Sequence, residues 1–145
     1  MLEVGMKAPE LDFNVTGKGV VKLPDFKGKK VVLYFYPKDN TSGCTQEACS
    51  FRDYHDEILA RGAVIIGVSP DSDESHQRFR EKHNLPFYLV SDTDHELATA
   101  FGAWSSGKMH RSTFIIDEAG EIIKVFTKVN TAQHGKEVLE FLEGL

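Results

Sequence analysis

Continuous apolar runs mark the middle of the chain. Residues 31–36 and 63–68 are almost wholly apolar, which is typical of central strands covered on both faces. Residues 87–90 predict a third strand. In residues 10–15 polar and apolar positions alternate, and a short partner at residues 20–23 follows a glycine-containing turn. This alternation predicts a half-exposed amino-terminal β-hairpin.

Helical segments separate these runs. Residues 42–62 predict one long helix that ends at a glycine, a natural C-cap residue. Residues 73–83 predict a second helix, and residues 94–101 predict a short one that is again followed by glycine. A terminal helix is expected at residues 131–142. Helices therefore alternate with the three predicted inner strands.

The carboxy-terminal third adds two strands at residues 113–117 and 121–126, which flank a Glu-Ala-Gly turn and predict an antiparallel hairpin. Strand, helix, strand, helix, strand, hairpin and helix is the order of a thioredoxin-like α/β domain with additions. We therefore predict a central mixed sheet flanked by helices, with an N-terminal β-hairpin. No linker or repeat divides residues 1–145, which predicts a single domain.

Composition and charge narrow the function classes. The chain is 41% hydrophobic and 27% charged, as in soluble globular proteins. Its net charge of -5 and scattered basic residues argue against a nucleic-acid surface, and the basic cluster at residues 27–30 predicts a solvated turn. The amino terminus lacks the pattern of a secretory signal, and no apolar run reaches membrane-spanning length. We expect a cytoplasmic protein without membrane or nucleic-acid partners.

Cys44, one of two cysteines, lies where the strand at residues 31–36 gives way to the long helix. Unpaired backbone N–H groups and the positive end of the helix macrodipole favour thiolate over thiol at such a position. A chain of this length buries a core without disulfides, so two cysteines in a reducing compartment indicate catalytic or redox chemistry. The plainer alternative for Cys44 is a buried small hydrophobe.

Helical geometry separates Cys44 from Cys49. The inward face, within about 60° of Cys44, is predicted to hold Ala48, Phe51, His55, Ile58 and Leu59. Cys49 lies about 140° away, on the side expected to meet solvent. Cα atoms five residues apart on a helix are separated by about 8–9 Å, beyond the roughly 7 Å limit for a disulfide. A bond between these thiols would therefore require the helix to unwind, and a surface thiol without a role is an equal alternative for Cys49.

A metal site is weakly supported. Zinc sites favour closely spaced cysteine pairs, whereas four residues separate Cys44 from Cys49 and no second pair follows. None of the histidines has convincing ligand spacing to these cysteines, and His55 is expected to be packed or hydrogen-bonded. We therefore predict neither a metal nor a cofactor.

The segment Pro37-Lys-Asp-Asn-Thr41-Ser-Gly-Cys44 fits the peroxiredoxin active-site pattern of proline, three residues, threonine or serine, two residues and cysteine. Through residue 53 it resembles the Q-type peroxiredoxins, or bacterioferritin comigratory proteins, an atypical two-cysteine branch in which the second cysteine lies five positions on. The likeness extends to residues 5–9, 67–79, 86–92 and 111–117. Two departures are Ser42, where many members have proline, and a shorter connection at residues 103–110.

This resemblance implies a thiol-dependent peroxidase that reduces hydrogen peroxide and organic hydroperoxides to water and alcohols. Cys44 would be the peroxidatic nucleophile and would become a sulfenic acid. Cys49 would be the resolving cysteine, closing an intramolecular Cys44–Cys49 disulfide after local helix unfolding. Thioredoxin or a similar dithiol would reduce that disulfide. A monomer would suffice, because the resolving thiol belongs to the same chain.

The resemblance also assigns roles around the sulfur. Thr41 would hydrogen-bond thiolate and peroxide, Pro37 would shield the sulfur from water, and Arg111 would bind the peroxide oxygens and stabilise the thiolate. Taken singly, these residues suit a helix cap, a strand terminator and a solvated charge. Glu47 is expected only to complement the helix dipole from the first turn.

Two other function classes use the same cysteine. A redox-sensing or chaperone-like interaction protein could expose Phe51 and its neighbours when the oxidised helix opens. A cysteine hydrolase also suits a nucleophile at a helix start, but it needs a general-base histidine, for which His110 beside Arg111 is the candidate.

Overall fold

A computed structural model describes residues 1–26 and 28–145, so Lys27, within the predicted turn at residues 27–30, lies outside the described residues. In chain order the elements are β1 (Asp12–Val15), β2 (Gly19–Lys22), the 3-10 helix η1 (Leu23–Phe26), β3 (Lys30–Phe35), α1 (Ser42–Asp53), α2 (His55–Ala60), β4 (Ala63–Ser69), α3 (Asp73–His83), β5 (Tyr88–Ser91), α4 (Glu96–Phe101), β6 (Trp104–Ser105), β7 (Lys108–Met109), β8 (Ser112–Ile116), β9 (Ile122–Phe126) and α5 (His134–Glu143). The predicted strands are present with small shifts at their ends, and so are the predicted helices except the long one at residues 42–62, which is divided into α1 and α2.

A seven-stranded sheet runs in the order β2-β1-β5-β4-β3-β8-β9. Strands β3, β4 and β5 are parallel, whereas β8 and β9 continue the sheet antiparallel beside β3. The hairpin β1–β2 extends the other side, where Val15 pairs with Val90. The predicted mixed sheet of a thioredoxin-like fold, with its N-terminal hairpin, is confirmed.

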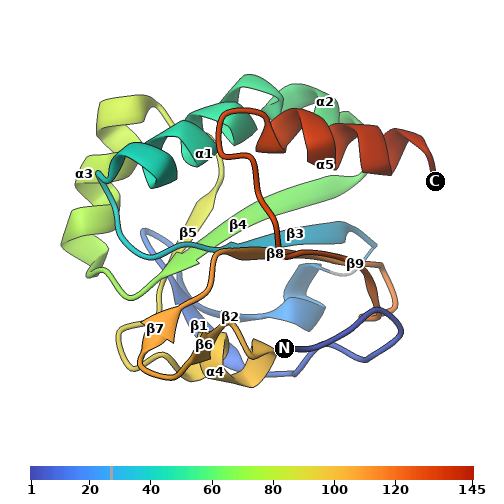
Figure 1. Cartoon of the computed structure of the whole chain (residues 1–145), viewed down its shortest axis with the longest axis horizontal. Helices are drawn as coiled ribbons and strands as arrows, with labels where there is room; N and C mark the ends of the chain where they lie inside the picture. Colours follow the sequence, from blue (N-terminus) through green and yellow to red (C-terminus); the bar gives the residue numbers. More distant parts are fainter. Residues whose placement is uncertain (27) are drawn as a thin grey trace.

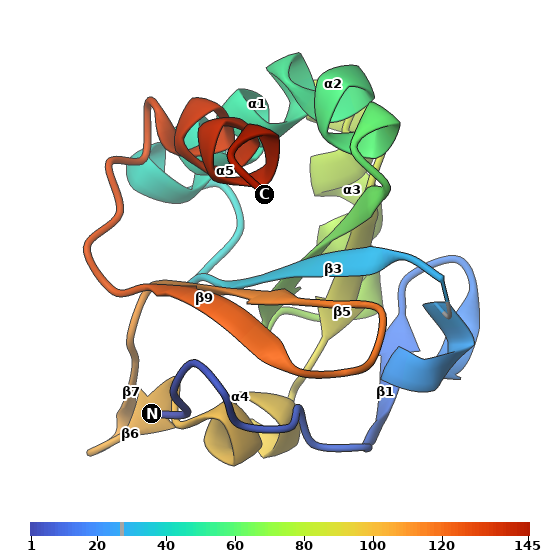
Figure 2. The same cartoon turned by 90° about the vertical axis from the view of Figure 1, so that its right-hand side faces the viewer.

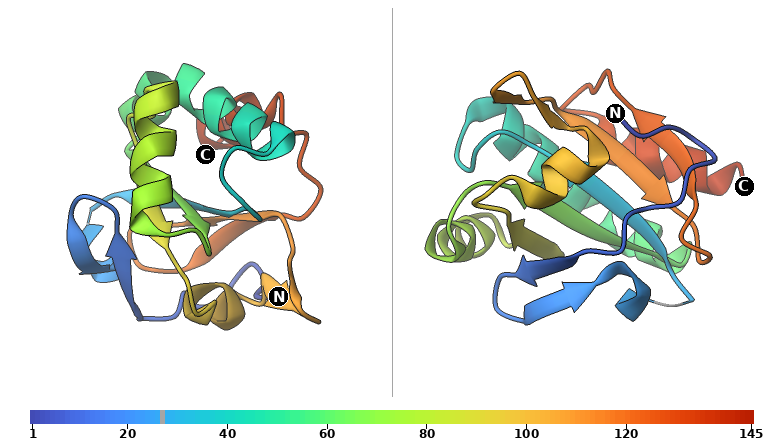
Figure 3. Two further views of the ribbon diagram at one scale, coloured as in Figure 1. Left: turned by 90° about the vertical axis from the view of Figure 1, so that its left-hand side faces the viewer. Right: turned by 90° about the horizontal axis from the view of Figure 1, so that it is seen from below.

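Helices cover both faces of this sheet. Helices α1, α2, α3 and α5 lie on one face, as Figures 1 and 2 show. Helix α4, the β6–β7 hairpin and the amino-terminal segment lie on the other (Figure 3). Successive residues of β3 point alternately into two cores, Val32 and Tyr34 toward α1 and α5, Leu33 and Phe35 toward α4. Burial on both faces accounts for the unbroken apolar run in this strand.

The predicted long helix is two helices, because α1 ends at Asp53 and α2 begins at His55. Tyr54 between them departs from helical geometry, with φ -108° and ψ 9°. The bend lets α1 pack on α5 while Ile58 of α2 stays in the core. It also turns Leu59 outward, where this side chain is 43% exposed, so its predicted place on the inward face is wrong.

The short connection at residues 103–110 forms a second, two-stranded sheet from β6 and β7, which the sequence pattern does not predict. Ser106 and Gly107 join the two strands, and both have positive φ, as a type I′ turn requires. Strands of two residues are too short to leave a periodic signal. Among the helices that the structure describes, none combines the length and the apolar character needed to span a membrane.

Candidate active site

Cys44 lies in the first turn of α1 and is buried, with 1% of its surface exposed. A loop from residue 36 to residue 41 leads to it from the carboxyl end of β3. Thr41 is the N-cap residue, but its hydroxyl donates to the Lys38 carbonyl at 3.0 Å and makes no capping bond. The backbone of α1 begins at Thr41, whose carbonyl accepts from Thr45 at 2.9 Å. Thr41 and Pro37 are both exposed at the rim of this loop.

Arg111 reaches the sulfur from another part of the chain. It directly precedes β8, whose first residue, Ser112, pairs with Phe35 at the end of β3, so the antiparallel pairing places it beside the start of α1. Its Nη2 donates to the Cys44 Sγ at 3.2 Å. The side chain is 23% exposed, so the reading as a fully solvated charge is wrong.

Glu47 holds the other side of this guanidinium. Arg111 Nη1 donates to Glu47 Oε1 at 2.6 Å, and the Glu47 side chain is completely buried. Burial raises the pKa of Glu47 to about 7, although Arg111 acts in the opposite direction. Burial alone would lower the pKa of Arg111, but the charge of Glu47 and the hydrogen bond to Cys44 outweigh it, so that pKa is raised.

The expected role of Glu47 in the first turn of the helix is therefore wrong. It lies in the second turn, three residues after Cys44, and residues at this spacing share a helix face. The three-residue spacing is a sequence signal that Glu47 lies on the same helix face as Cys44. A carboxylate is expected to be buried there only if a cation pairs with it, and the sequence alone does not show that Arg111 does so. We call Cys44, Arg111 and Glu47 the Cys44 cluster.

Gly43 lets the guanidinium approach the helix. A Cβ atom at this position would lie 3.4 Å from Arg111 Nη2 and 3.8 Å from the methyl carbon of Thr131. A methyl group would therefore just touch the guanidinium, and a larger side chain would press on the group that contacts the sulfur. The glycine therefore keeps the space that Arg111 occupies.

Tyr34 lies in the core beneath the Cys44 cluster. Its ring packs on Phe51 with centroids 4.7 Å apart. Burial raises the pKa of Tyr34 well above its ordinary value, and the charges of Glu47 and Cys44 add to this effect. Within the described residues, the Tyr34 hydroxyl and Glu47 Oε2 are buried without hydrogen-bond partners. The hydrogen-bonding capacity of these two atoms near Cys44 is therefore unused among the described residues.

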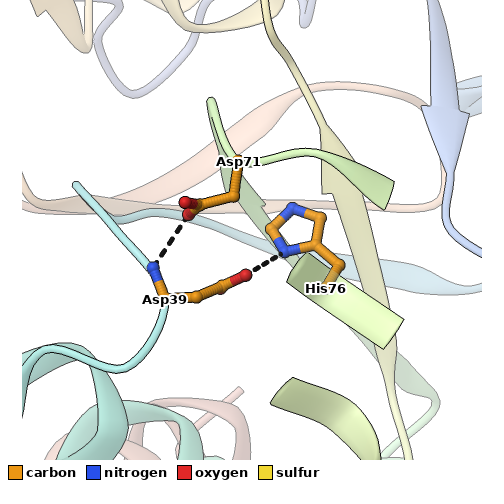
Figure 4. Close-up of side chains that lie close together, drawn as sticks. All are labelled: Asp39, Asp71 and His76. Carbon is orange, nitrogen blue, oxygen red and sulfur yellow. Dashed lines mark hydrogen bonds and ion pairs between the residues drawn. The ribbon is translucent and has the colours of Figure 1, made fainter. Parts of the chain in front are cut away.

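A second buried group holds the loop that precedes α1. Asp39 on this loop lies between Asp71, which follows β4, and His76 on α3 (Figure 4). The Asp39 N–H donates to Asp71 Oδ2 at 2.8 Å, and the Asp39 carboxylate is 2.7 Å from His76 Nδ1. The Asp39 cluster, as we define it, comprises Tyr36, Asp39, Ser69, Asp71, Ser75 and His76.

Three possible ligand atoms of the Asp39 cluster, from Asp39, Asp71 and His76, lie within 4.8 Å of one another. They are already engaged, because Asp71 Oδ2 accepts from Ser69 at 2.6 Å and His76 Nε2 faces the Val90 carbonyl at 3.0 Å. A cation would have to displace these hydrogen bonds. The donor set therefore fits a closed hydrogen-bonded group better than a metal centre.

The two cysteines are free thiols on the same helix. Cys44 is buried, whereas Cys49 is partly exposed, as the predicted divergence of the two side chains requires. His110 does not approach Cys44, because its Nε2 lies 2.9 Å from the Ser105 hydroxyl in the β6–β7 hairpin. The general base of the hydrolase alternative is thus directed elsewhere. His55 is partly buried, with Nδ1 3.5 Å from Asp56.

Comparison with known proteins places this geometry in context. Residues 4–125 match the model of the AhpC/TSA family. The chain is 50% identical to Peroxiredoxin Bcp of Bacillus subtilis, over 99% of this chain and 97% of that protein, and 40% identical to Peroxiredoxin Bcp of Escherichia coli, over 98% and 96%. The solved structure of the Xanthomonas campestris bacterioferritin comigratory protein superposes with a TM-score of 0.90 at 34% identity, covering 98% of each chain.

Proposed function

Because the chain belongs to the AhpC/TSA family and is a peroxiredoxin, we propose that it reduces hydrogen peroxide and organic hydroperoxides by a two-cysteine cycle recycled by a thioredoxin-type dithiol. The Xanthomonas protein is described with an alkyl peroxide reduction activity, and we extend this substrate class to the present chain. Residues 1–145 would act as one unit, as a monomer, in a reducing compartment such as the cytoplasm.

In the first step the Cys44 thiolate attacks one peroxide oxygen and the O–O bond breaks. The leaving oxygen takes a proton and departs as water or an alcohol, while Cys44 becomes a sulfenic acid. Arg111, 3.2 Å from the sulfur, would stabilise the thiolate and the charge that develops on the leaving oxygen. Thr41 would orient the peroxide, and Pro37 would limit the access of water.

In the second step the Cys49 thiol attacks the Cys44 sulfenic acid, which releases water and forms the disulfide. Both cysteines belong to α1, and a straight helix holds their Cα atoms about 8–9 Å apart, beyond disulfide reach. The first turns of α1 would therefore open in every cycle. A partner dithiol would then return both thiols and become a disulfide itself.

One observation carries this proposal. The guanidinium of Arg111 links the Cys44 sulfur, at 3.2 Å, to the fully buried Glu47, at 2.6 Å. Two charge-assisted hydrogen bonds hold the cation against the nucleophile before any substrate arrives. This preorganisation distinguishes a reactive thiol from a packed one, because it costs no reorganisation during the reaction.

The test is peroxide consumption with thioredoxin, thioredoxin reductase and NADPH. We expect Cys44→Ser to abolish turnover. Cys49→Ser is the matched control on the same helix and should still consume one equivalent of peroxide, but recycle poorly. The intact mass of the wild type should fall by two hydrogens after one equivalent.

Two results would contradict this assignment. Undiminished turnover in Cys49→Ser would remove its resolving role. Stoichiometric oxidation of the wild type without turnover would instead favour a redox-sensing protein.

A further inference from the structure

We propose that two anchors limit the opening of α1 to residues 40–49. The Asp39 cluster would hold the chain just before this segment, and the contact of Ser50 with Gly135 on α5 would hold it just after Cys49. This inference rests on the proposed Cys44–Cys49 disulfide. It adds where the unwinding starts and stops.

The first anchor is the carboxylate of Asp39, a residue that is 3% exposed. Its Oδ1 accepts from the Tyr36 hydroxyl at 2.6 Å, and its Oδ2 accepts from the Ser75 hydroxyl at 2.8 Å and faces His76 Nδ1 at 2.7 Å. The backbone N–H of Asp39 is bound as well, to Asp71 at 2.8 Å. Side chain and backbone thus tie this loop residue to β3, α3 and the end of β4.

Charge strengthens this anchor. Both ring nitrogens of the fully buried His76 face oxygen atoms, those of Asp39 and of the Val90 carbonyl. The ring thereby connects the loop before α1 to α3 and to β5. Burial alone would raise the pKa of Asp39, but the hydrogen bonds and charge of His76 outweigh it and the pKa is lowered. Separating such a buried pair is costly.

An exposed stretch follows the first anchor directly. Asn40 is exposed and has φ 65°, in the left-handed region, which asparagine tolerates better than most residues. Thr41 and Ser42 are exposed too. The chain therefore passes from a buried, fully bonded residue to three solvent-facing ones, which can change conformation without uncovering the core.

The second anchor joins α1 to α5. The Gly135 N–H donates to the Ser50 hydroxyl at 2.8 Å, and a Cβ at Gly135 would overlap the Ser50 carbonyl, so the two backbones are in direct contact. Phe51, next in α1, is fully buried. Arg52 adds a bond to the His83 carbonyl at 2.9 Å. Unwinding beyond Cys49 would break all of these contacts.

The links that hold the segment between the anchors centre on the group that reacts. Side-chain hydrogen bonds tie it to the rest of the fold through Arg111, which binds Cys44 and Glu47, and through Thr131, which donates to Gln46 at 2.8 Å. Conversion of the Cys44 thiolate to the uncharged sulfenic acid removes the charge that Arg111 binds. The segment is thus loosened at the step that requires it to open.

The experiment forms the disulfide without peroxide. Diamide, an azodicarboxamide, takes two electrons and two protons from the two thiols and becomes the hydrazine while the S–S bond forms. Hydrogen exchange of the reduced and oxidised wild type is then compared by mass spectrometry. We expect faster exchange in peptides covering residues 40–53, because the amides of residues 50–53 donate to the carbonyls of residues 46–49. Exchange should be unchanged at residues 36–39 and 54–58, where Tyr54 donates to the Ser50 carbonyl and Ile58 to that of Tyr54.

Variants test the first anchor in the reduced protein. Ser75→Ala removes one donor from the Asp39 carboxylate and should raise exchange at residues 36–39 about tenfold. Gln77→Ala, on the exposed face of the same helix, is the matched control and should leave this exchange unchanged.

The inference is overturned if oxidation speeds exchange at residues 36–39 or 54–58 in the wild type. It is also overturned if diamide forms no intramolecular bond, or if Ser75→Ala behaves like Gln77→Ala. Absence of peroxide turnover would sink the proposed function alone, because the diamide result does not depend on it.

Discussion

The Cys44 cluster and the Asp39 cluster lie on either side of the start of α1 and are built alike. Each pairs a buried carboxylate with a nitrogen-bearing side chain, Glu47 with Arg111 and Asp39 with His76. In the Asp39 cluster both carboxylate oxygens accept hydrogen bonds, and the pKa of Asp39 is lowered. Glu47 keeps one oxygen without a partner in the described residues, and burial raises its pKa to about 7.

This difference separates a cluster that stabilises the fold from a cluster that takes part in the chemistry. The Asp39–His76 pair is enclosed, with both side chains at most 1% exposed, whereas the Arg111 side chain is 23% exposed. A partly exposed cation can still receive a substrate oxygen. A fully enclosed pair can only stabilise the fold. Substitutions should therefore lower stability in one cluster and rate in the other.

The largest effect is expected at His76. The apolar His76→Leu leaves the Asp39 carboxylate buried without the ring nitrogen 2.7 Å from it, and loss of one partner of a buried pair costs about 3–5 kcal/mol. Urea unfolding of the reduced protein at pH 7 measures this cost, with Gln77→Ala as the control on the exposed face of α3. A loss below about 1 kcal/mol would contradict the view of this cluster as a structural clamp.

Arg111→Met should lower the rate of Cys44 oxidation more than it lowers stability. Removing the cation at the sulfur should slow single-turnover oxidation of Cys44 by about 100-fold, or about 2.7 kcal/mol. Stability should fall less than in His76→Leu, because Glu47 can take up a proton when it loses its partner. Stopped-flow mixing with hydrogen peroxide measures the rate, and Arg78→Met, an exposed arginine on α3, is the control. Equal rates in the two variants would exclude Arg111 from the chemistry.

Glu47→Gln should have the smallest effect, and a pH-dependent one. The pKa of Glu47 is raised by burial from 4.5 to about 7, so the folded state holds this proton more tightly than the unfolded state. Its contribution to stability is complete below pH 4.5 and is lost as the pH rises through 7, a change of about 2 kcal/mol between pH 5 and pH 8.

The glutamine variant removes this group from the titration. The change in unfolding free energy between pH 5 and pH 8 should therefore be about 2 kcal/mol smaller in Glu47→Gln than in the wild type. Glu57→Gln, at an exposed position of α2, should follow the wild type. Parallel curves for wild type and Glu47→Gln would show that Glu47 is ionised across the whole range.

Apolar runs were sufficient to predict the sheet and most helices, because β3 and β4 are buried on both faces and leave strong signals. They could not predict the bend at Tyr54, because neither proline nor glycine marks the place in the sequence. The bend is slight enough that Ile58 still donates to the Tyr54 carbonyl. The β6–β7 hairpin was also missed. Both features depend on what packs against a segment rather than on its own pattern.

Cys44, Cys49, Thr41, Pro37 and Arg111 were all candidates from the sequence, and the structure brings Arg111 to Cys44. The roles of these five residues stay predictions. Glu47 and the Asp39–His76 pair were missed as site features. Their environment arises from contacts between elements distant in sequence, as with Asp39 on the loop and His76 on α3. A polar residue in a helix is more often solvated, and only tertiary structure shows otherwise.

Gly67 and Tyr34 are register partners on β4 and β3. A Cβ on Gly67 would lie 2.7 Å from Cζ of the tyrosine ring, 2.8 Å from its hydroxyl and 2.9 Å from Cδ2 of Leu89, so the ring and the leucine fill the space that a side chain at 67 would need. These positions are therefore not free to diverge independently. In a lineage of such proteins, a larger residue at 67 should be tolerated only after room has been made at 34 and 89, and the order of the changes should be the same whenever they occur.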